Sequence, residues 1–159
     1  GEVFSIIPYT THINIKNVSK NFNGIKVNKF LKNILCLIKL KKYNLKYDYV
    51  KFLCYNPHCG ENGTIGNEDV FISKIISKYR KISGPYPADS SFNNIKKNTL
   101  FIATYHDQAL IPFKIINKVG INLTLGLEYR RISPAHGTAV DKLYKNISNI
   151  SSYLTCMQI

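Results

Sequence analysis

The sequence has no tryptophan, a single methionine, and only 9 Asp and Glu residues against 22 Lys and Arg. It also lacks any apolar run near the ~20 residues that a transmembrane helix needs. Hydrophobic residues nevertheless make up 45% of the 159 residues and aromatic residues 12%, which is too apolar for a disordered basic tail. The composition therefore excludes disordered, collagen-like and membrane-spanning proteins, and it leaves a globular chain long enough to bury a core.

Arginine is scarce even though the formal net charge is +13, since only Arg80, Arg130 and Arg131 are arginines. Proteins that recognise bases favour the planar, two-pronged guanidinium group of arginine. The lysines here are scattered among Asn, Ile and Tyr, so we interpret the charge as a solvated basic surface. A basic nucleic-acid-binding module stays as an alternative, and its binding would depend steeply on salt.

The four cysteines show no CxxC spacing, so the sequence predicts neither a zinc knuckle nor a disulfide framework. Cys36 and Cys54 lie within apolar runs and are expected to be buried thiols. The first residues, 1–5, show neither the basic segment nor the apolar segment of a signal peptide. We therefore expect a reducing, cytoplasmic location.

Apolar periodicity predicts alternating helices and strands. Apolar residues spaced by three and four predict a helix over 27–38 and a second over 68–79, which begins at Asn67 as its N-cap and ends before Gly84-Pro85. Buried strands are predicted at 49–55, 99–104 and 119–125, with a loop over 105–108, a helix over 109–116 and more helix after Gly137. This alternation indicates an α/β layered fold with a mainly parallel sheet.

Histidines lie in short polar segments, and two of these segments directly follow predicted strands: the four are His12, His58, His106 and His136. Ligands of open α/β sheets bind outside the carboxyl ends of the strands. Neutral imidazoles are good ligands for a divalent metal, so convergence of three or four would make a metal site. The spacing alone leaves that convergence open, because there is no HxH or HExxH motif.

Other polar residues complete the set of candidates. Asp89 and Asp107 could orient the imidazoles or transfer protons. The cationic and amide side chains of Lys114, Asn122 and Arg131 adjoin apolar runs and suit an anionic substrate. The glycines of the loop over 56–66 lack the G-x-G start of a dinucleotide-binding fingerprint, so they are weak support for a Rossmann site and leave open a turn over a phosphate.

Six strings spread over nearly the whole chain carry a resemblance to a known family. They are, in order, Thr10-Thr11-His12, Asn56-Pro57-His58-x-Gly60-Glu61-x-Gly63-x-x-Gly66-x-Glu68, Gly84-Pro85-x-Pro87-Ala88-Asp89, Tyr105-His106-Asp107-Gln108, Asn122-x-Thr124-Leu125-Gly126-Leu127 and His136-Gly137-Thr138-Ala139. Together they resemble the 4-hydroxythreonine-4-phosphate dehydrogenases of pyridoxal phosphate biosynthesis. The chain departs from that family at Pro134-Ala135, where an aspartate is usual, and at Leu143-Tyr144, where small residues are usual.

The resemblance implies an activity and a site. The activity is NAD-dependent oxidation of the C3 hydroxyl of 4-phosphooxy-L-threonine, followed by loss of carbon dioxide to leave 3-amino-2-oxopropyl phosphate. It implies a divalent metal (Zn, Mg or Co) that polarises the hydroxyl. The residues that the resemblance assigns are His12, His58 and His106 for the metal, Lys114, Asn122 and Arg131 for the substrate, and the site aspartates Asp89 and Asp107.

The resemblance also implies a domain organisation like that of isocitrate and isopropylmalate dehydrogenases. Residues 1–125 would form the second, metal- and substrate-binding domain, and residues 126–159 would return to a mostly absent N-terminal domain. The family works as a homodimer with sites at the subunit interface. Members of the family are about twice as long as this chain. We therefore expect the chain to be a fragment with an incomplete substrate pocket and little or no activity alone.

Two further alternatives remain open. A paralogous enzyme acting on 4-phospho-threonate or erythronate would share these motifs. A zinc hydrolase could use the same histidines with Glu61 as the base that activates a metal-bound water.

Overall fold

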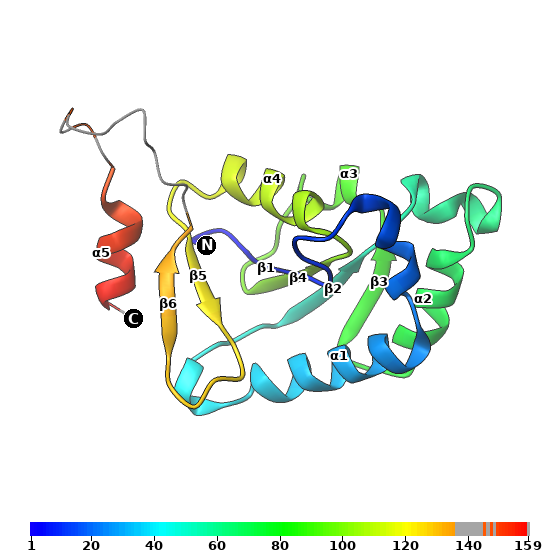
Figure 1. Ribbon diagram of the computed structural model, residues 1–159, viewed down its shortest axis with the longest axis horizontal. Coiled ribbons are helices and arrows are strands. Elements are labelled where there is room, and N and C mark those ends of the chain that lie inside the picture. The colour runs from blue at the N-terminus through cyan, green and yellow to red at the C-terminus, as the bar shows by residue number, and fades with distance from the viewer. Residues whose placement is uncertain (136–144, 146, 148, 159) are drawn as a thin grey trace.

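The structure, a computed structural model, describes residues 1–135, 145, 147 and 149–158. Its centre is a four-stranded, all-parallel sheet in the order β1-β4-β2-β3. The strands are β1 (Ser5–Pro8), β2 (Tyr49–Leu53), β3 (Ile82–Tyr86) and β4 (Thr99–Ala103). Helices flank both faces of this sheet (Figure 1), so the predicted α/β layered fold is confirmed.

Two apolar cores lie on opposite faces of the sheet. One face packs against α1 (Gly24–Leu37) and α2 (Glu68–Ile76), and the other packs against α3 (Ala88–Ser91) and α4 (His106–Ile116). Alternate residues of a strand point to opposite faces, so Phe52 and Ile102 join the first core while Leu53 and Phe101 join the second. The two predicted helical stripes are confirmed as the faces that α1 and α2 bury.

A hairpin stands beside the sheet (Figure 1). It pairs β5 (Ile121–Thr124) with β6 (Arg131–Pro134) in antiparallel register, and α5 (Ser151–Gln158) contacts it through a bond from Gly120 N to Ser152 Oγ of 3.4 Å. The predicted strand at 119–125 is thus present but belongs to this hairpin. The division at residue 125 falls inside the hairpin, and the two-domain organisation stays a prediction. His136 and Leu143-Tyr144 lie outside the described residues.

Short 3-10 helices connect the main elements: η1 (Ile15–Asn17), η2 (Ser19–Asn21), η3 (Lys41–Tyr43) and η4 (Pro57–Gly63). Across the described part of the chain, no helix is long and apolar enough to cross a bilayer.

Several local predictions were wrong. The helix over 68–79 ends before Gly84-Pro85 as predicted, but the strand that contains this pair, β3, was not predicted; β3 is an edge strand, where proline needs no partner for its missing N–H. The segment over 105–108 was predicted as a loop, but only Tyr105 precedes α4, and residues 106–108 already belong to its first turn. Asn67 occupies the N-cap position of α2, but its side chain makes no capping bond. Cys36 is exposed, whereas Cys54 is buried as predicted.

Candidate active site

His12 and His106 lie next to each other at the carboxyl ends of adjacent strands. His12 follows β1 and His106 begins α4 directly after β4, and β1 pairs with β4. The centroids of the two imidazole rings are 5.3 Å apart and their planes are tilted by 50°. The structure therefore brings His12 and His106 together, while their role as metal ligands stays a prediction.

The spacing of the pair can be compared with what a shared metal ion requires. Zinc binds imidazole nitrogen at about 2.0–2.1 Å, so two rings on one tetrahedral ion have centroids about 5 Å apart. The observed 5.3 Å fits two ligands of one ion. Among the described residues, however, no three His, Cys, Asp or Glu side chains gather into a metal site, so His58 does not complete the set within this chain.

Asp107 contacts the imidazole of His106. Its Oδ1 lies 2.7 Å from His106 Nδ1, and the two side chains are 72% and 41% exposed. In the tautomer that donates its Nδ1–H to this carboxylate, Nε2 carries the lone pair. That nitrogen can then bind a metal or accept a proton. The orienting role of Asp107 stays a prediction.

His58 lies on a turn with an unusual backbone. Five consecutive residues, 58–62, have φ between 45° and 73°. This is the left-handed region, which costs residues other than glycine about 1–2 kcal/mol each. Only glycine fits at residue 60, where a Cβ would come within 2.5 Å of the Gly66 carbonyl oxygen. Here the glycines of the loop serve its own close packing.

The left-handed turn yields a stability prediction. Glu61 is exposed and has φ 45°, so Glu61→Gly should be more stable than Glu61→Ala by about 1 kcal/mol, because glycine carries no Cβ to clash. Urea unfolding of both variants measures the difference. The matched control is Lys74 in α2, where glycine should be less stable than alanine by a similar amount. Equal stability of the two Glu61 variants would contradict a left-handed conformation there.

A buried carboxylate holds the segment that leads into this turn. Asp69, in the first turn of α2, is 1% exposed and accepts bonds from Tyr55 N (2.6 Å), Asn56 N (2.9 Å) and Asn56 Nδ2 (3.0 Å). Pro57 then connects Asn56 to His58 with a restricted φ. The position of His58 therefore depends on Asp69.

Two thiols and Asp89 lie close to the same turn. Burial raises the pKa of the Cys59 thiol, and the neighbouring Cys54 and the charges of Asp69 and Asp89 raise it further. Burial likewise raises the pKa of Cys54. Both thiols are therefore expected to be protonated at neutral pH. Asp89 is thus on the His58 side of the site, and Asp107 is on the His106 side.

A groove of about 840 Å³ runs along β1, whose four residues all line it. His12 and His106 line this groove together with Lys114 of α4 and Asn122 of β5. Four of the eight predicted site residues therefore share one cavity. Arg131 does not line it. It lies opposite Thr124 in the hairpin and donates to Thr124 Oγ1 at 3.1 Å, on the same hairpin face as Asn122.

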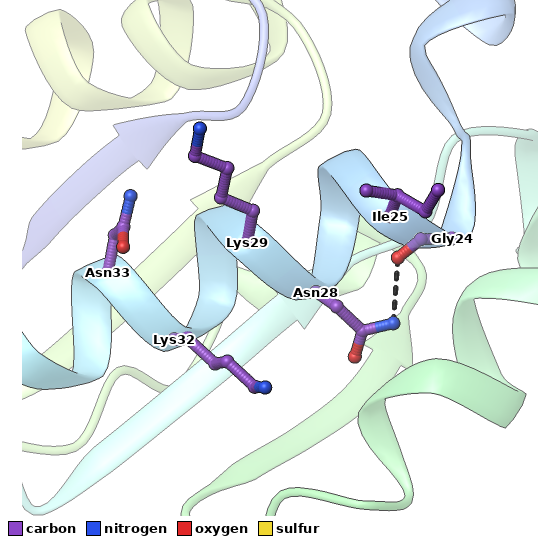
Figure 2. A pocket seen from close by; sticks show the side chains of 6 residues that line it. All are labelled: Gly24, Ile25, Asn28, Lys29, Lys32 and Asn33. Atoms are coloured by element: carbon purple, nitrogen blue, oxygen red, sulfur yellow. Dashed lines mark hydrogen bonds between the residues drawn. The ribbon is translucent and has the colours of Figure 1, made fainter.

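A second hollow, of about 530 Å³, lies on the outer side of α1 (Figure 2). Figure 2 shows that its two cations, Lys29 and Lys32, point away from each other, while Asn28 Nδ2 bonds to the Gly24 carbonyl at 2.7 Å. Diverging lysines do not make an anion site. None of the predicted site residues lines this hollow.

The sequence analysis missed Asp69 and Thr104, and it noted Gln108 only as part of a string. All three make half-buried hydrogen bonds at the carboxyl ends of β2 and β4, just before the segments that carry His58 and His106. The sequence indicated Asp69 only as an acidic residue suited to the first turn of a helix, and it gave no sign that the carboxylate bonds to the segment before His58. The contact partners of Thr104 and Gln108 have no signal in a single sequence.

Comparison with known protein families places these residues in context. The family model described as "Pyridoxal phosphate biosynthetic protein PdxA" matches residues 1–159. The chain is 38% identical over 155 residues to a 4-hydroxythreonine-4-phosphate dehydrogenase from Hydrogenobaculum sp. (strain Y04AAS1), covering 96% of this chain and 49% of that protein. It is 35% identical over 166 residues to one from Aquifex aeolicus (strain VF5), covering 100% and 51%.

A solved structure shows the same likeness. The crystal structure of 4-hydroxythreonine-4-phosphate dehydrogenase from Klebsiella pneumoniae superposes with a TM-score of 0.70 at 26% identity, over 99% of this chain and 50% of that one. The chain therefore spans about half the length of the relatives that it matches.

Proposed function

The chain belongs to the PdxA family of pyridoxal phosphate biosynthetic proteins, and from this membership we propose that residues 1–159 supply the metal- and substrate-binding side chains of a 4-hydroxythreonine-4-phosphate dehydrogenase. The reaction is oxidation of the C3 hydroxyl of 4-phosphooxy-L-threonine with transfer of hydride to NAD, then loss of carbon dioxide to give 3-amino-2-oxopropyl phosphate. The observation that carries the proposal is the His12–His106 pair in the same groove as Lys114 and Asn122.

We propose that His12, His58 and His106 hold a divalent metal. When bound, such an ion supplies Lewis acidity, polarising the substrate hydroxyl and favouring negative charge on its oxygen. The spacing of His12 and His106 supports two of the three ligands. Because His58 does not join them within one chain, we propose that a second copy supplies it across a homodimer interface.

The chain's other residues have roles that follow from their positions. Asp107 holds His106 with its Nε2 lone pair toward the reaction. Lys114 and Asn122 bind the anionic ends of the substrate, and Arg131 on the shared hairpin face adds a third polar group. Asp89, beside the His58 turn, is proposed to accept or return the hydroxyl proton. NAD serves as the electron acceptor that no side chain can replace.

Substrate binding tests this proposal. Lys114→Met should weaken binding of 4-phosphooxy-L-threonine, measured by calorimetry in the presence of Zn²⁺, by about 10- to 100-fold, because a hydrogen bond to a charged group contributes about 1.5–3 kcal/mol. Lys74→Met, on the exposed side of α2, is the control and should leave affinity unchanged. Equal affinity of the Lys114 variant and the parent chain would contradict the assignment, and tighter binding of 4-phospho-threonate or erythronate would favour the paralogous activity.

A further inference from the structure

A chain of hydrogen bonds connects the three segments that carry His12, His106 and His58. These segments follow β1, β4 and β2, which are consecutive neighbours in the sheet. The connecting groups lie just before each histidine segment, at the carboxyl ends of the strands. Residues at this level can therefore set how far apart the three segments stand.

The first link joins the β1 and β4 segments. Thr10 donates to the Thr104 carbonyl oxygen through Oγ1 at 2.8 Å and through its backbone N at 3.3 Å. Thr104 is fully buried, so these bonds are shielded from water. Thr10 is two residues before His12, and Thr104 is two residues before His106.

The second link joins the β4 and β2 segments and runs through one side chain. Gln108 Oε1 accepts from Thr104 N at 2.7 Å and from Thr104 Oγ1 at 2.9 Å, while Gln108 Nε2 donates to the Cys54 carbonyl oxygen at 2.7 Å. Cys54 is buried at the end of β2, four residues before His58. A single amide group thus bonds to both strand ends.

The chemistry of this position requires an amide of this length. The head group must accept two bonds on one side and donate one on the other, which a carboxylate or a thioether does not do. Asparagine is one methylene shorter and cannot span the same gap. Gln108 itself does not line the groove that holds His12 and His106.

We propose that Gln108 is a positioning residue: by joining the ends of β4 and β2 it holds Thr104, which bonds to Thr10, and so fixes the distance between the rings of His106 and His12. The inference rests on the proposed function in treating the three histidines as the working groups. The competing role is that of a helix cap, because a glutamine in the first turn of a helix commonly bonds back to the backbone before it. A cap would stabilise α4 without controlling the spacing of the rings.

The experiment separates these roles with two readouts. In the chain without metal, labelled at histidine, the nuclear Overhauser contact between the His12 and His106 rings reports their spacing. With Co²⁺ as the probe, the visible spectrum and a titration report the coordination geometry and affinity. The variants are Gln108→Met, which keeps the length, and Gln108→Asn, which keeps the amide and has the milder effect on folding. Asn28→Leu is the control, because Asn28 is another half-buried amide with two bonded partners, on α1.

Both Gln108 variants are expected to keep their far-ultraviolet circular dichroism, to lose the ring contact, and to bind Co²⁺ about 10- to 100-fold more weakly, the usual effect of removing a group behind a ligand. Asn28→Leu should keep the ring contact and the affinity. Retention of the ring contact in Gln108→Met or Gln108→Asn would overturn the proposal and leave Gln108 as a helix cap. Loss of the ring contact in Asn28→Leu, in addition to its loss in the Gln108 variants, would also overturn the proposal. If the parent chain binds no Co²⁺, the proposed function fails, and the ring contact alone still decides the role of Gln108.

Discussion

Replacing His106 with alanine is expected to weaken Zn²⁺ binding by at least about 100-fold. Zinc sites in small proteins bind with about 10–16 kcal/mol over four ligands, so one ligand accounts for about 3 kcal/mol, and each 1.4 kcal/mol is tenfold. His12→Ala should give a similar loss, since the two rings stand at the spacing of a shared ion. Competition with a chromophoric zinc chelator measures the affinities. Lys114→Ala, which changes the same groove without removing an imidazole, should leave Zn²⁺ affinity within about threefold of the parent.

Mixing variants tests whether His58 comes from a second copy. A His58→Ala chain and a His106→Ala chain should each bind Zn²⁺ weakly alone. If the site is shared across a dimer, each hybrid dimer contains one intact site, so a one-to-one mixture that exchanges subunits regains about a quarter of the sites. If one chain supplied all three ligands, every site in the mixture would lack a ligand and nothing would be regained. Full Zn²⁺ affinity in the His12→Ala and His106→Ala chains would contradict the metal site itself.

The parts of the fold that were predicted from the sequence have strong periodic patterns. The stripe from Val27 to Ile38 and the apolar runs at 49–55 and 99–104 indicated α1, β2 and β4, because burial of a helix face or a whole strand leaves a pattern in the sequence. β1 and β3 have weaker patterns. Both are edge strands, so neither needs a continuous apolar run, and β3 even tolerates Pro85.

From the sequence, the candidate site could be predicted only as a set of polar residues that follow strands, without the contacts between them. The rule that ligands bind at the carboxyl ends of strands concerned His58 and His106, which follow predicted strands, and it left their convergence open; His12 lies beside His106 because it follows β1, a strand that was not predicted. The rule did not place His58, whose position depends on a left-handed turn that few sequences adopt. It also could not show that Gln108 reaches Cys54, since a contact between residues 54 apart along the chain depends on how two strand ends pack.

Replacing Asp69 with alanine is expected to lower the free energy of unfolding by about 3–5 kcal/mol. The carboxylate accepts three bonds at 1% exposure, and its removal leaves the backbone N–H groups of Tyr55 and Asn56 without their acceptor. An unsatisfied buried donor costs about 1–3 kcal/mol, and a bond to a charged acceptor is stronger than a neutral one. Domains of this size are stable by only about 5–15 kcal/mol, so the change removes a large share of the total.

Urea unfolding of three variants identifies what Asp69 does. Asp69→Asn keeps one acceptor but turns an N–H₂ group toward the donors, so its loss should be intermediate, at about 2 kcal/mol, and it provides the measurement if the alanine variant does not fold. Asp48→Ala is the control, because Asp48 is exposed and accepts a single bond, from Asn98 Nδ2 at 2.9 Å. Its effect should stay within about 1 kcal/mol. A similarly small effect of Asp69→Ala would mean that the segment before His58 keeps its position without the carboxylate. The expected large loss, together with weaker Zn²⁺ binding by Asp69→Asn, would mean instead that one buried charge both stabilises the fold and places His58.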